Sequence, residues 1–450
     1  MFHSYDVRGK YKSDIDVQHA YLLGVSFARS HRPKTVIIGY DARIGSDVLA
    51  HAITDGLLDE GVNVTFVGLV STPVVWFAVN NEKADGGIMV TASHNPKEYV
   101  GFKFCTKHAK PLSLSDGLEK IQKIYNTLQV DTISHPKKAG NLTQKDMTDE
   151  YISYMLPFGN NITSEKKILF DCSNGSIGPV LTNVLKNLPM ECVIRNVHPD
   201  GTFPNHSPNP LNTDAQMQFG EDIRAQKADG GIMFDGDGDR IVCFDEFGTV
   251  LPPESVLYLI VQQLRYVYQN TKKFSVVHDL RMSKSLQESL ESQQIKTIKT
   301  KVGRPSIIGS MKQNKSIVGG EISGHYYFQN FFDCDDGIVA ALHVLSYLCN
   351  EHETLSTLTQ DLNPYSKPDE INIERTQDFS DIRLTLKERY SHATIEELDG
   401  ISVYDSRFWF NIRPSNTEKL LRITLEADSE EILDTLKSEL SNILGVSTLA

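Results

Sequence analysis

The feature that most constrains the fold is a heptapeptide, Lys-Ala-Asp-Gly-Gly-Ile-Met, which occurs twice, at residues 83–89 and 227–233. Each copy ends in an apolar run typical of a buried strand, and a polar loop follows at once. Chance rarely places such a match in two equivalent settings, so the repeat indicates a duplicated structural unit. A third strand-like run within 315–325 again passes through a Gly pair into a polar loop.

Strand-like and helix-like segments alternate around the first copy of the heptapeptide. A strand is predicted over 35–41, an amphipathic helix over 46–61 and a strand over 62–70. This βαβ order predicts a parallel sheet covered by helices, and segments 166–240 and 274–325 repeat it. A chain of 450 residues is too long for one core. We therefore predict three similar α/β domains with mixed, largely parallel sheets and a smaller C-terminal α+β domain around a central cleft, over 1–138, 139–249, 250–363 and 364–450.

Charge and hydropathy exclude several classes of partner. The formal net charge of −13 argues against nucleic-acid and anionic-membrane binding, which need a basic surface. No stretch approaches the roughly 20 apolar residues of a membrane span, and the start lacks the apolar core of a signal peptide. The six cysteines form no C-x-x-C pair, so we expect thiols rather than disulfides or a zinc site. A cytoplasmic protein is predicted.

The loop after the second heptapeptide concentrates carboxylates. Asp235, Asp237 and Asp239 alternate with glycines, and their repulsion is costly unless a hard, oxygen-seeking cation such as Mg²⁺ binds them. The alternative is an EF-hand calcium loop. Its sixth position requires Gly, where this chain has Arg240, and its flanks must be helical, where this chain has strand-like segments. The pattern therefore favours Mg²⁺.

The other loops supply nucleophilic and anion-binding groups. Residues 91–96 place the Ser93 hydroxyl beside the His94 imidazole, without the G-x-S-x-G elbow of a hydrolase. Residues 319–325 offer side chains suited to the hydroxyls of a sugar, and residues 413–418 combine a guanidinium with hydroxyls and an amide, the parts of a phosphate nest. Each loop alone is also compatible with an ordinary polar turn.

Taken together and in this order, the motifs resemble the α-D-phosphohexomutase family, most closely its phosphomannomutase/phosphoglucomutase branch. The matching stretches are TASHNPKEYVGFKF, DGDGDR, GGEISGHYYF and RPSNTEKLLR, with YDVRG near the start and DGTFPNHSPNPL at 200–211. They extend from residue 5 to about residue 427. The family has four domains around a cleft, and each domain contributes one loop.

The resemblance implies a role for each matched residue. Ser93 is the phosphoryl carrier, and its phosphate joins the three aspartates at Mg²⁺. Lys103 matches the general acid/base lysine and Arg8 a charged active-site residue, while His94 and Arg240 complete the catalytic set. The sugar is expected to contact Glu321, Ser323, His325, Arg281 and Arg304, and the non-reacting phosphate to contact Arg413, Ser415, Asn416 and Thr417.

Two positions depart from the family pattern. Relatives often have a histidine where this chain has Arg304, and an arginine cannot titrate as an acid or base. Relatives often have a lysine where this chain has Arg281, which keeps the charge but changes the geometry.

The resemblance implies an enzyme that moves a phosphoryl group on a phosphorylated hexose through phosphoserine and a hexose 1,6-bisphosphate. It favours phosphomannomutase activity, with phosphoglucomutase activity alongside, in a monomer or homodimer. Three alternatives stay open: a phosphoglucosamine mutase, a metal-dependent sugar phosphatase and a non-catalytic sugar-phosphate sensor.

Overall fold

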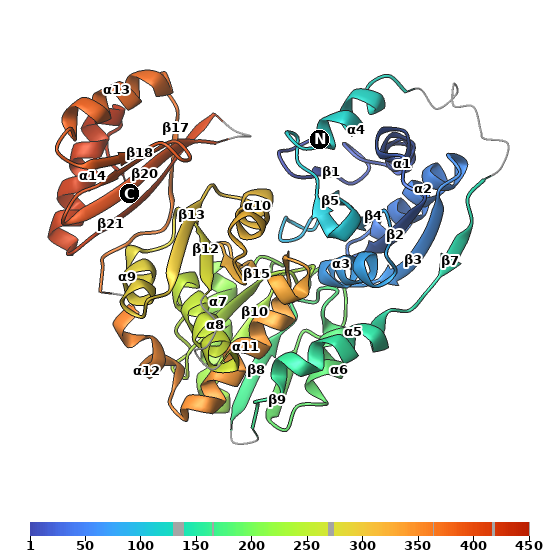
Figure 1. Cartoon of the computed structure of the whole chain (residues 1–450), viewed down its shortest axis with the longest axis horizontal. Coiled ribbons are helices and arrows are strands. Elements are labelled where there is room, and N and C mark those ends of the chain that lie inside the picture. The colour runs from blue at the N-terminus through green and yellow to red at the C-terminus, as the bar shows by residue number, and fades with distance from the viewer. Residues whose placement is uncertain (129–138, 164–165, 269–273, 363, 416–418, 450) are drawn as a thin grey trace.

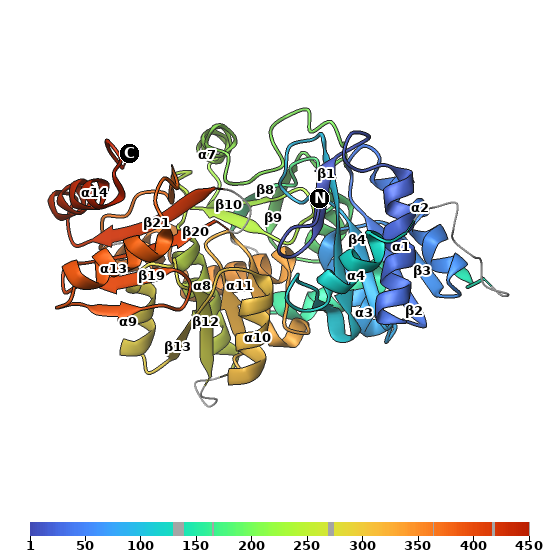
Figure 2. The ribbon, with the colours of Figure 1, turned by 90° about the horizontal axis from the view of Figure 1, so that it is seen from above.

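The computed structural model describes residues 1–128, 139–163, 166–268, 274–362, 364–415 and 419–449. Four sheets follow one another along the chain, each with its own helices. Figure 1 shows them as an arc, in which the first unit (blue) and the last unit (red) are the two ends and the green and yellow units lie between them. Figure 2 shows the same row of units from above.

The first sheet is mixed and has the strand order β1-β5-β4-β2-β3-β7, with β6 beside β5. The parallel pairs are β4 with β2, β2 with β3, and β3 with β7. The antiparallel pairs are β1 with β5, β5 with β4, and β5 with β6. Its strands are β1 (Val7–Lys10), β2 (Thr35–Tyr40), β3 (Asn63–Leu69), β4 (Gly86–Val90), β5 (Tyr99–Thr106), β6 (Lys110–Pro111) and β7 (Leu142–Gln144), and its helices are α1 (Val17–His31), α2 (Ser46–Asp59), α3 (Thr72–Asn81) and α4 (Leu118–Tyr125).

The second and third sheets are also mixed, with orders β11-β10-β8-β9 and β13-β12-β14-β15-β16. The second unit contains α5 (Thr148–Met155), β8 (Lys167–Asp171), α6 (Gly178–Leu185), β9 (Glu191–Arg195), α7 (Thr213–Gln226), β10 (Gly230–Phe234) and β11 (Ile241–Phe244). The third contains α8 (Pro253–Val267), β12 (Ser275–Asp279), α9 (Lys284–Ser292), β13 (Lys296–Thr300), α10 (Arg304–Asn314), β14 (Val318–Gly320), β15 (Tyr326–Phe328), β16 (Cys334–Asp335), α11 (Gly337–Glu351) and α12 (Leu355–Thr359).

The last sheet is antiparallel throughout, in the order β17-β21-β20-β19-β18. Its elements are β17 (Ile371–Glu374), α13 (Phe379–Arg389), β18 (Thr394–Glu396), β19 (Ile401–Tyr404), β20 (Phe408–Pro414), β21 (Leu420–Ala427) and α14 (Glu430–Leu444). The prediction of three α/β units and a different α+β unit is confirmed. The predicted boundaries between the units stay predictions.

The duplicated heptapeptide adopts the same structure twice. Lys83 and Lys227 both have left-handed backbone, with φ of 53° and 50°, at the end of a helix. The following strands, β4 and β10, are buried, and each pairs parallel on one side and antiparallel on the other. Lys315 repeats the left-handed turn, with φ of 54°, ahead of β14. Each of the three loops therefore follows the same series of elements: a helix, a lysine with left-handed backbone and a buried strand.

The cores show which units are fused. One continuous cluster joins α3 of the first unit to α5, α6, α8 and α11 of the next two, and Trp76 lies fully buried within it. The last unit has a separate core between its sheet and its two helices. Burial of apolar surface therefore fixes the first three units to one another, while the last unit is held by other contacts.

The described cysteines are all free thiols. Within the described ranges, no helix has the length and hydropathy that crossing a bilayer requires.

Candidate active site

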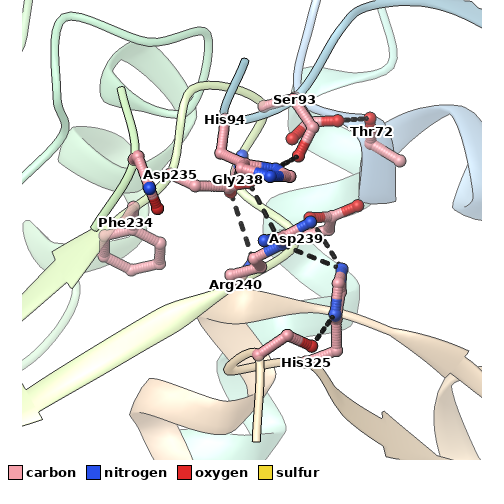
Figure 3. A network of polar contacts seen from close by, with 12 residues as sticks. Thr72, Ser93, His94, Phe234, Asp235, Gly238, Asp239, Arg240 and His325 are labelled. Atoms are coloured by element: carbon pink, nitrogen blue, oxygen red, sulfur yellow. Dashed lines mark hydrogen bonds and ion pairs between the residues drawn. The ribbon is translucent and has the colours of Figure 1, made fainter. Parts of the chain in front are cut away.

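Three of the four predicted loops meet. The loops follow β4, β10 and β14, at the carboxyl ends of strands, where open α/β sheets place their ligands. The Ser93 hydroxyl donates to Asp235 Oδ2 at 2.8 Å, and the backbone N–H of Ile241 donates to the Gly324 carbonyl at 3.1 Å. Figure 3 shows Ser93 and His94 on one side of the 235–240 loop and His325 on the other.

Ser93 occupies a strained backbone position. Its φ of 52° is left-handed, which is uncommon for a residue with a Cβ and clusters at functional sites. The backbone N–H donates to Thr91 Oγ1 at 2.8 Å, and Oγ lies 3.3 Å from His94 Nδ1. The side chain is buried, so its orientation is fixed by these contacts toward the aspartate loop.

Arg43 holds the serine loop from behind. Its buried guanidinium lies 5.2 Å from the ring of Phe203 in the second unit, and Asp41 pairs with it at 3.2 Å. It donates to three backbone carbonyls of the loop, those of Ser93 (2.6 Å), Asn95 (2.5 Å) and Pro96 (2.8 Å), and to the carbonyl of Tyr99 (3.0 Å) at the start of β5. Because one rigid fork makes all these bonds, Arg43 fixes the shape of the loop that carries Ser93.

The three aspartates fit a divalent cation. Their carboxylate oxygens lie within 4.8 Å of one another, and the side chains are at most 1% exposed. Asp237 Oδ1 and Asp239 Oδ1 are buried without a hydrogen-bond partner among the described residues. Closely spaced, buried carboxylate oxygens are the ligand set that Mg²⁺ prefers. The EF-hand alternative is wrong, because strands β10 and β11 flank the loop.

Lys103 reaches the same aspartates from β5. Its Nζ lies 2.6 Å from Asp237 Oδ2 and 2.5 Å from Asp239 Oδ2, and Thr72 Oγ1 donates to Asp237 Oδ2 at 2.6 Å. Burial alone lowers the pKa of Lys103, but the two carboxylates outweigh it and hold that pKa above its usual value. Lys103 is therefore positively charged at neutral pH.

The imidazole next to the serine is neutral. The guanidinium of Arg240 and then burial lower the pKa of His94 well below its ordinary value, with Arg8 adding to the effect. Arg8 donates to Asn95 Oδ1 at 2.5 Å and pairs with Asp6 at 2.7 Å. Arg8 is therefore bonded to the loop that carries Ser93, and His94 contacts the serine itself.

The third loop contributes one residue directly to this group. His325 Nε2 accepts from Arg240 Nε at 3.1 Å and lies 3.4 Å from Asp239, while its Nδ1 is 2.8 Å from Ser323 Oγ. Glu321 accepts a hydrogen bond from the buried Tyr327 hydroxyl. The loop therefore presents a hydroxyl, an imidazole and a carboxylate beside the metal loop.

Arg304 packs between two units. Its Nε lies 3.1 Å from Asp335 Oδ1, and its guanidinium carbon is 4.5 Å from the centre of the Trp76 ring in α3. Asp335 raises the pKa of Arg304 above its usual value despite burial, so Arg304 carries a fixed positive charge. Contact of Arg304 with substrate stays a prediction.

A second group of predicted residues forms around Glu370, just before β17. Arg413 donates to Glu370 Oε2 at 3.0 Å, and Arg281 lies 3.5 Å from the same oxygen. The Ser415 backbone N–H bonds the Leu420 carbonyl. Two further predicted phosphate contacts, Asn416 and Thr417, lie outside the described residues.

Comparison with known proteins identifies the family of this chain. Family models match the chain in four consecutive segments: phosphoglucomutase/phosphomannomutase domain I at 1–131, domain II at 149–248, domain III at 252–365 and the C-terminal domain at 370–443. The chain belongs to the phosphoglucomutase/phosphomannomutase family. The resemblance of its motifs is thereby confirmed, as is its classification as a phosphohexomutase, an enzyme that transfers a phosphoryl group within a hexose phosphate.

Full-length relatives lead to the same family. A phosphomannomutase of Methanocaldococcus jannaschii is 35% identical over 99% of this chain and 97% of its own length. A phosphomannomutase of Escherichia coli is 31% identical over 97% of both chains. A crystal structure of a phosphoglucomutase/phosphomannomutase family protein from Burkholderia thailandensis superposes with a TM-score of 0.89 at 25% identity, over 100% of this chain and 99% of that one.

Sequence reasoning missed three residues that contact the candidate site: Asp41, Arg43 and Thr72. The first two follow β2, a parallel strand whose carboxyl end faces the site, so an Asp-x-Arg pair at that point was a usable signal. Thr72 had no local signal, because its partner Asp237 is 165 positions away.

Proposed function

We propose that this enzyme is a phosphomannomutase that interconverts mannose 1-phosphate and mannose 6-phosphate, with glucose phosphates as further substrates. The observation that carries the proposal is the hydrogen bond from Ser93 Oγ to Asp235, within a buried group of carboxylates and next to Lys103. The relatives named phosphomannomutase support mannose as the sugar.

In the proposed cycle Ser93 begins as a phosphoserine. The bond between phosphorus and Ser93 Oγ breaks as a free hydroxyl of the hexose monophosphate bonds to phosphorus, and a 1,6-bisphosphate forms. Lys103 gives a proton to the departing Ser93 oxygen and recovers one from the sugar hydroxyl. The bisphosphate then turns over, and Ser93 takes up the other phosphoryl group, which releases the isomeric monophosphate.

The other residues of the proposed site bind the cation, the phosphates and the sugar. Asp235, Asp237 and Asp239 would hold Mg²⁺, which neutralises charge on a phosphoryl group when bound. Arg8 and Arg240 add positive charge beside Ser93, and His325 and Glu321 face the sugar. Arg281 contacts the sugar, and Arg413 binds the phosphate that does not react. We further propose a cytoplasmic location and the four domain boundaries predicted above.

Product analysis tests the proposal. Purified enzyme with Mg²⁺ and a trace of glucose 1,6-bisphosphate is given mannose 1-phosphate, glucose 1-phosphate or glucosamine 1-phosphate, and free phosphate is measured in parallel. Mannose 6-phosphate without phosphate release is expected. Preferred turnover of glucosamine 1-phosphate would instead indicate a phosphoglucosamine mutase, stoichiometric phosphate release a phosphatase, and no turnover a sensor.

Metal removal tests the cation assignment separately. Treatment with a chelator should abolish turnover, and added Mg²⁺ should restore it, because the three buried carboxylates lose the charge that balances them. An enzyme that stays active through chelation would contradict the proposal.

A further inference from the structure

Three guanidinium groups converge on the single carboxylate of Glu370. Its Oε2 is 3.0 Å from Arg413 Nη2 and 3.5 Å from Arg281 Nη1, and its Oε1 is 3.5 Å from Arg422 Nη1. Glu370 immediately precedes β17, the first strand of the last unit, whereas Arg281 follows β12 of the third unit. The carboxylate therefore sits at the junction between the two units.

This group is largely shielded from water. The side chains of Arg281, Arg413 and Glu370 are 8%, 7% and 15% exposed. Asp279 also pairs with Arg281, at 2.7 Å. Arg413 Nε is buried and has no hydrogen-bond partner among the described residues. Arg413 therefore retains donor capacity that Glu370 does not fill.

A carboxylate and a phosphate are interchangeable partners for arginine. Both present oxygens that a guanidinium binds through charge-assisted hydrogen bonds, and a phosphate dianion carries more charge and a further oxygen. We propose that Glu370 is the internal counter-anion of the phosphate site: it pairs with Arg413 when the site holds no phosphate, yields Arg413 to the sugar phosphate, and returns when the phosphate leaves. This rests on the proposed function only in naming the site as the one for the non-reacting phosphate.

The exchange has a kinetic consequence. The bisphosphate must dissociate from Arg413 before it can reorient in the site. A buried guanidinium without an anionic partner is destabilising. In the proposed exchange, Arg413 pairs with the Glu370 carboxylate as soon as the phosphate leaves, so its guanidinium always has an anionic partner. Glu370 thus lowers the affinity of the site for phosphate and in return speeds release, because tight binding of substrate and transition state alike does not raise kcat.

Phosphate affinity after neutralisation of Glu370 is the direct test. Inorganic phosphate is titrated by calorimetry into Mg²⁺-loaded full-length wild type and Glu370→Gln. The variant should bind on the order of tenfold more tightly, the effect of removing one competing charge-assisted contact. Glu374→Gln makes the same change at an exposed position on β17 and should match wild type. Unchanged or weaker binding in Glu370→Gln would overturn the proposal.

Two further variants keep the outcome specific. In an Arg413→Ala background, Glu370→Gln should no longer tighten phosphate binding, because the competition acts through Arg413. Persistence of the full gain there would also overturn the proposal. If Glu370→Gln fails to fold, Glu370→Asp is the substitute, because it keeps the charge but shortens the side chain by one methylene. Its phosphate affinity should rise by less than tenfold. A lower phosphate affinity in Glu370→Asp would contradict the proposal.

Turnover separates this inference from the proposed function. If the enzyme is a mutase, Glu370→Gln should lower KM and kcat together with either hexose monophosphate. If Glu370→Gln binds phosphate more tightly but the wild-type protein has no mutase activity, the counter-anion role of Glu370 stands and the proposed function is wrong. If the wild-type protein is a mutase but Glu370→Gln binds phosphate as wild type does, the proposed function stands and the counter-anion role is wrong.

Discussion

At the scale of single residues, the site depends on how Ser93 is held. Its hydroxyl meets Asp235, its carbonyl accepts from Arg43, and its backbone is left-handed. The serine is thus held at two points, by Asp235 of the second unit and Arg43 of the first, before any ligand binds. Such fixed placement is what phosphoryl transfer needs, since the protein contributes mainly position and charge.

Ser93→Ala should abolish turnover while the protein folds normally, because it removes the carrier oxygen and its hydrogen bonds to Asp235 and His94 but little packing. Intact-mass measurement should find a phosphate, about 80 Da heavier, on some wild-type molecules and on none of the variant. Substantial activity in Ser93→Ala would exclude a phosphoserine intermediate.

Arg43→Lys should lower kcat by about tenfold to a hundredfold with little change in KM, because one ammonium cannot replace a fork that binds four carbonyls. Steady-state kinetics check this, with Arg29→Lys as the control, since Arg29 pairs with Glu60 at the surface. Equal kinetics in Arg43→Lys and wild type would show that the fork does not position Ser93.

The sequence made some of these residues predictable and hid others. Asp235, Asp237 and Asp239 are close along the chain, so their repulsion and the need for a cation can be read locally. Arg43 acts through carbonyls about 50 positions away, and Glu370 gathers arginines from three separate segments. Contacts of this kind depend on how the units pack, which no local pattern encodes.

At the scale of elements, parallel pairing explains why the loops could be placed. β2 with β4, β8 with β10 and β12 with β14 are parallel pairs, so their carboxyl ends share an edge. The heptapeptide repeat was sufficient to predict two of these edges. The short strand β7 was not predicted, because it has three exposed residues, and only its pairing with β3 defines it.

The start of α11 gives a pH-dependent prediction. Asp336 caps this helix, accepts from Tyr151 at 2.5 Å, and burial raises its pKa to about 7. In the unfolded chain the value is about 3.9, so between these values the folded protein binds more protons and the free energy of unfolding falls as pH rises.

Asp336→Asn keeps an oxygen for the two capping N–H groups but removes this titration. The free energy of unfolding of the variant should therefore change less between pH 4.5 and 7 than that of wild type, where the slope reaches at most about 1.4 kcal/mol per pH unit from this group. Urea titrations followed by circular dichroism measure it, with the exposed Asp381→Asn as control. Parallel profiles for wild type and Asp336→Asn would contradict the raised pKa.

At the scale of the whole molecule, the uneven distribution of the core matters most. One apolar cluster fuses three units around Ser93 and the aspartates, whereas the last unit, with its own core, brings Arg413. Composition predicted several domains but not which of them share a core. A last unit tied to the third by polar contacts, such as Glu370 with Arg281, suits the proposed cycle, in which the site releases one phosphate of the bisphosphate and binds the other.

The last prediction concerns that phosphate in both directions of the reaction. If Arg413 holds the non-reacting phosphate in each half of the cycle, Arg413→Ala should lose kcat/KM for hexose 1-phosphate and hexose 6-phosphate alike, by roughly tenfold or more, since one charge-assisted hydrogen bond is worth about 1.5 to 3 kcal/mol. The 1,6-bisphosphate should also escape more often, so the variant should depend more on added glucose 1,6-bisphosphate. A purely structural Arg413 would instead lower Tm and leave both values of kcat/KM in place. A loss confined to one direction would exclude a shared grip on both phosphates, even in an active mutase.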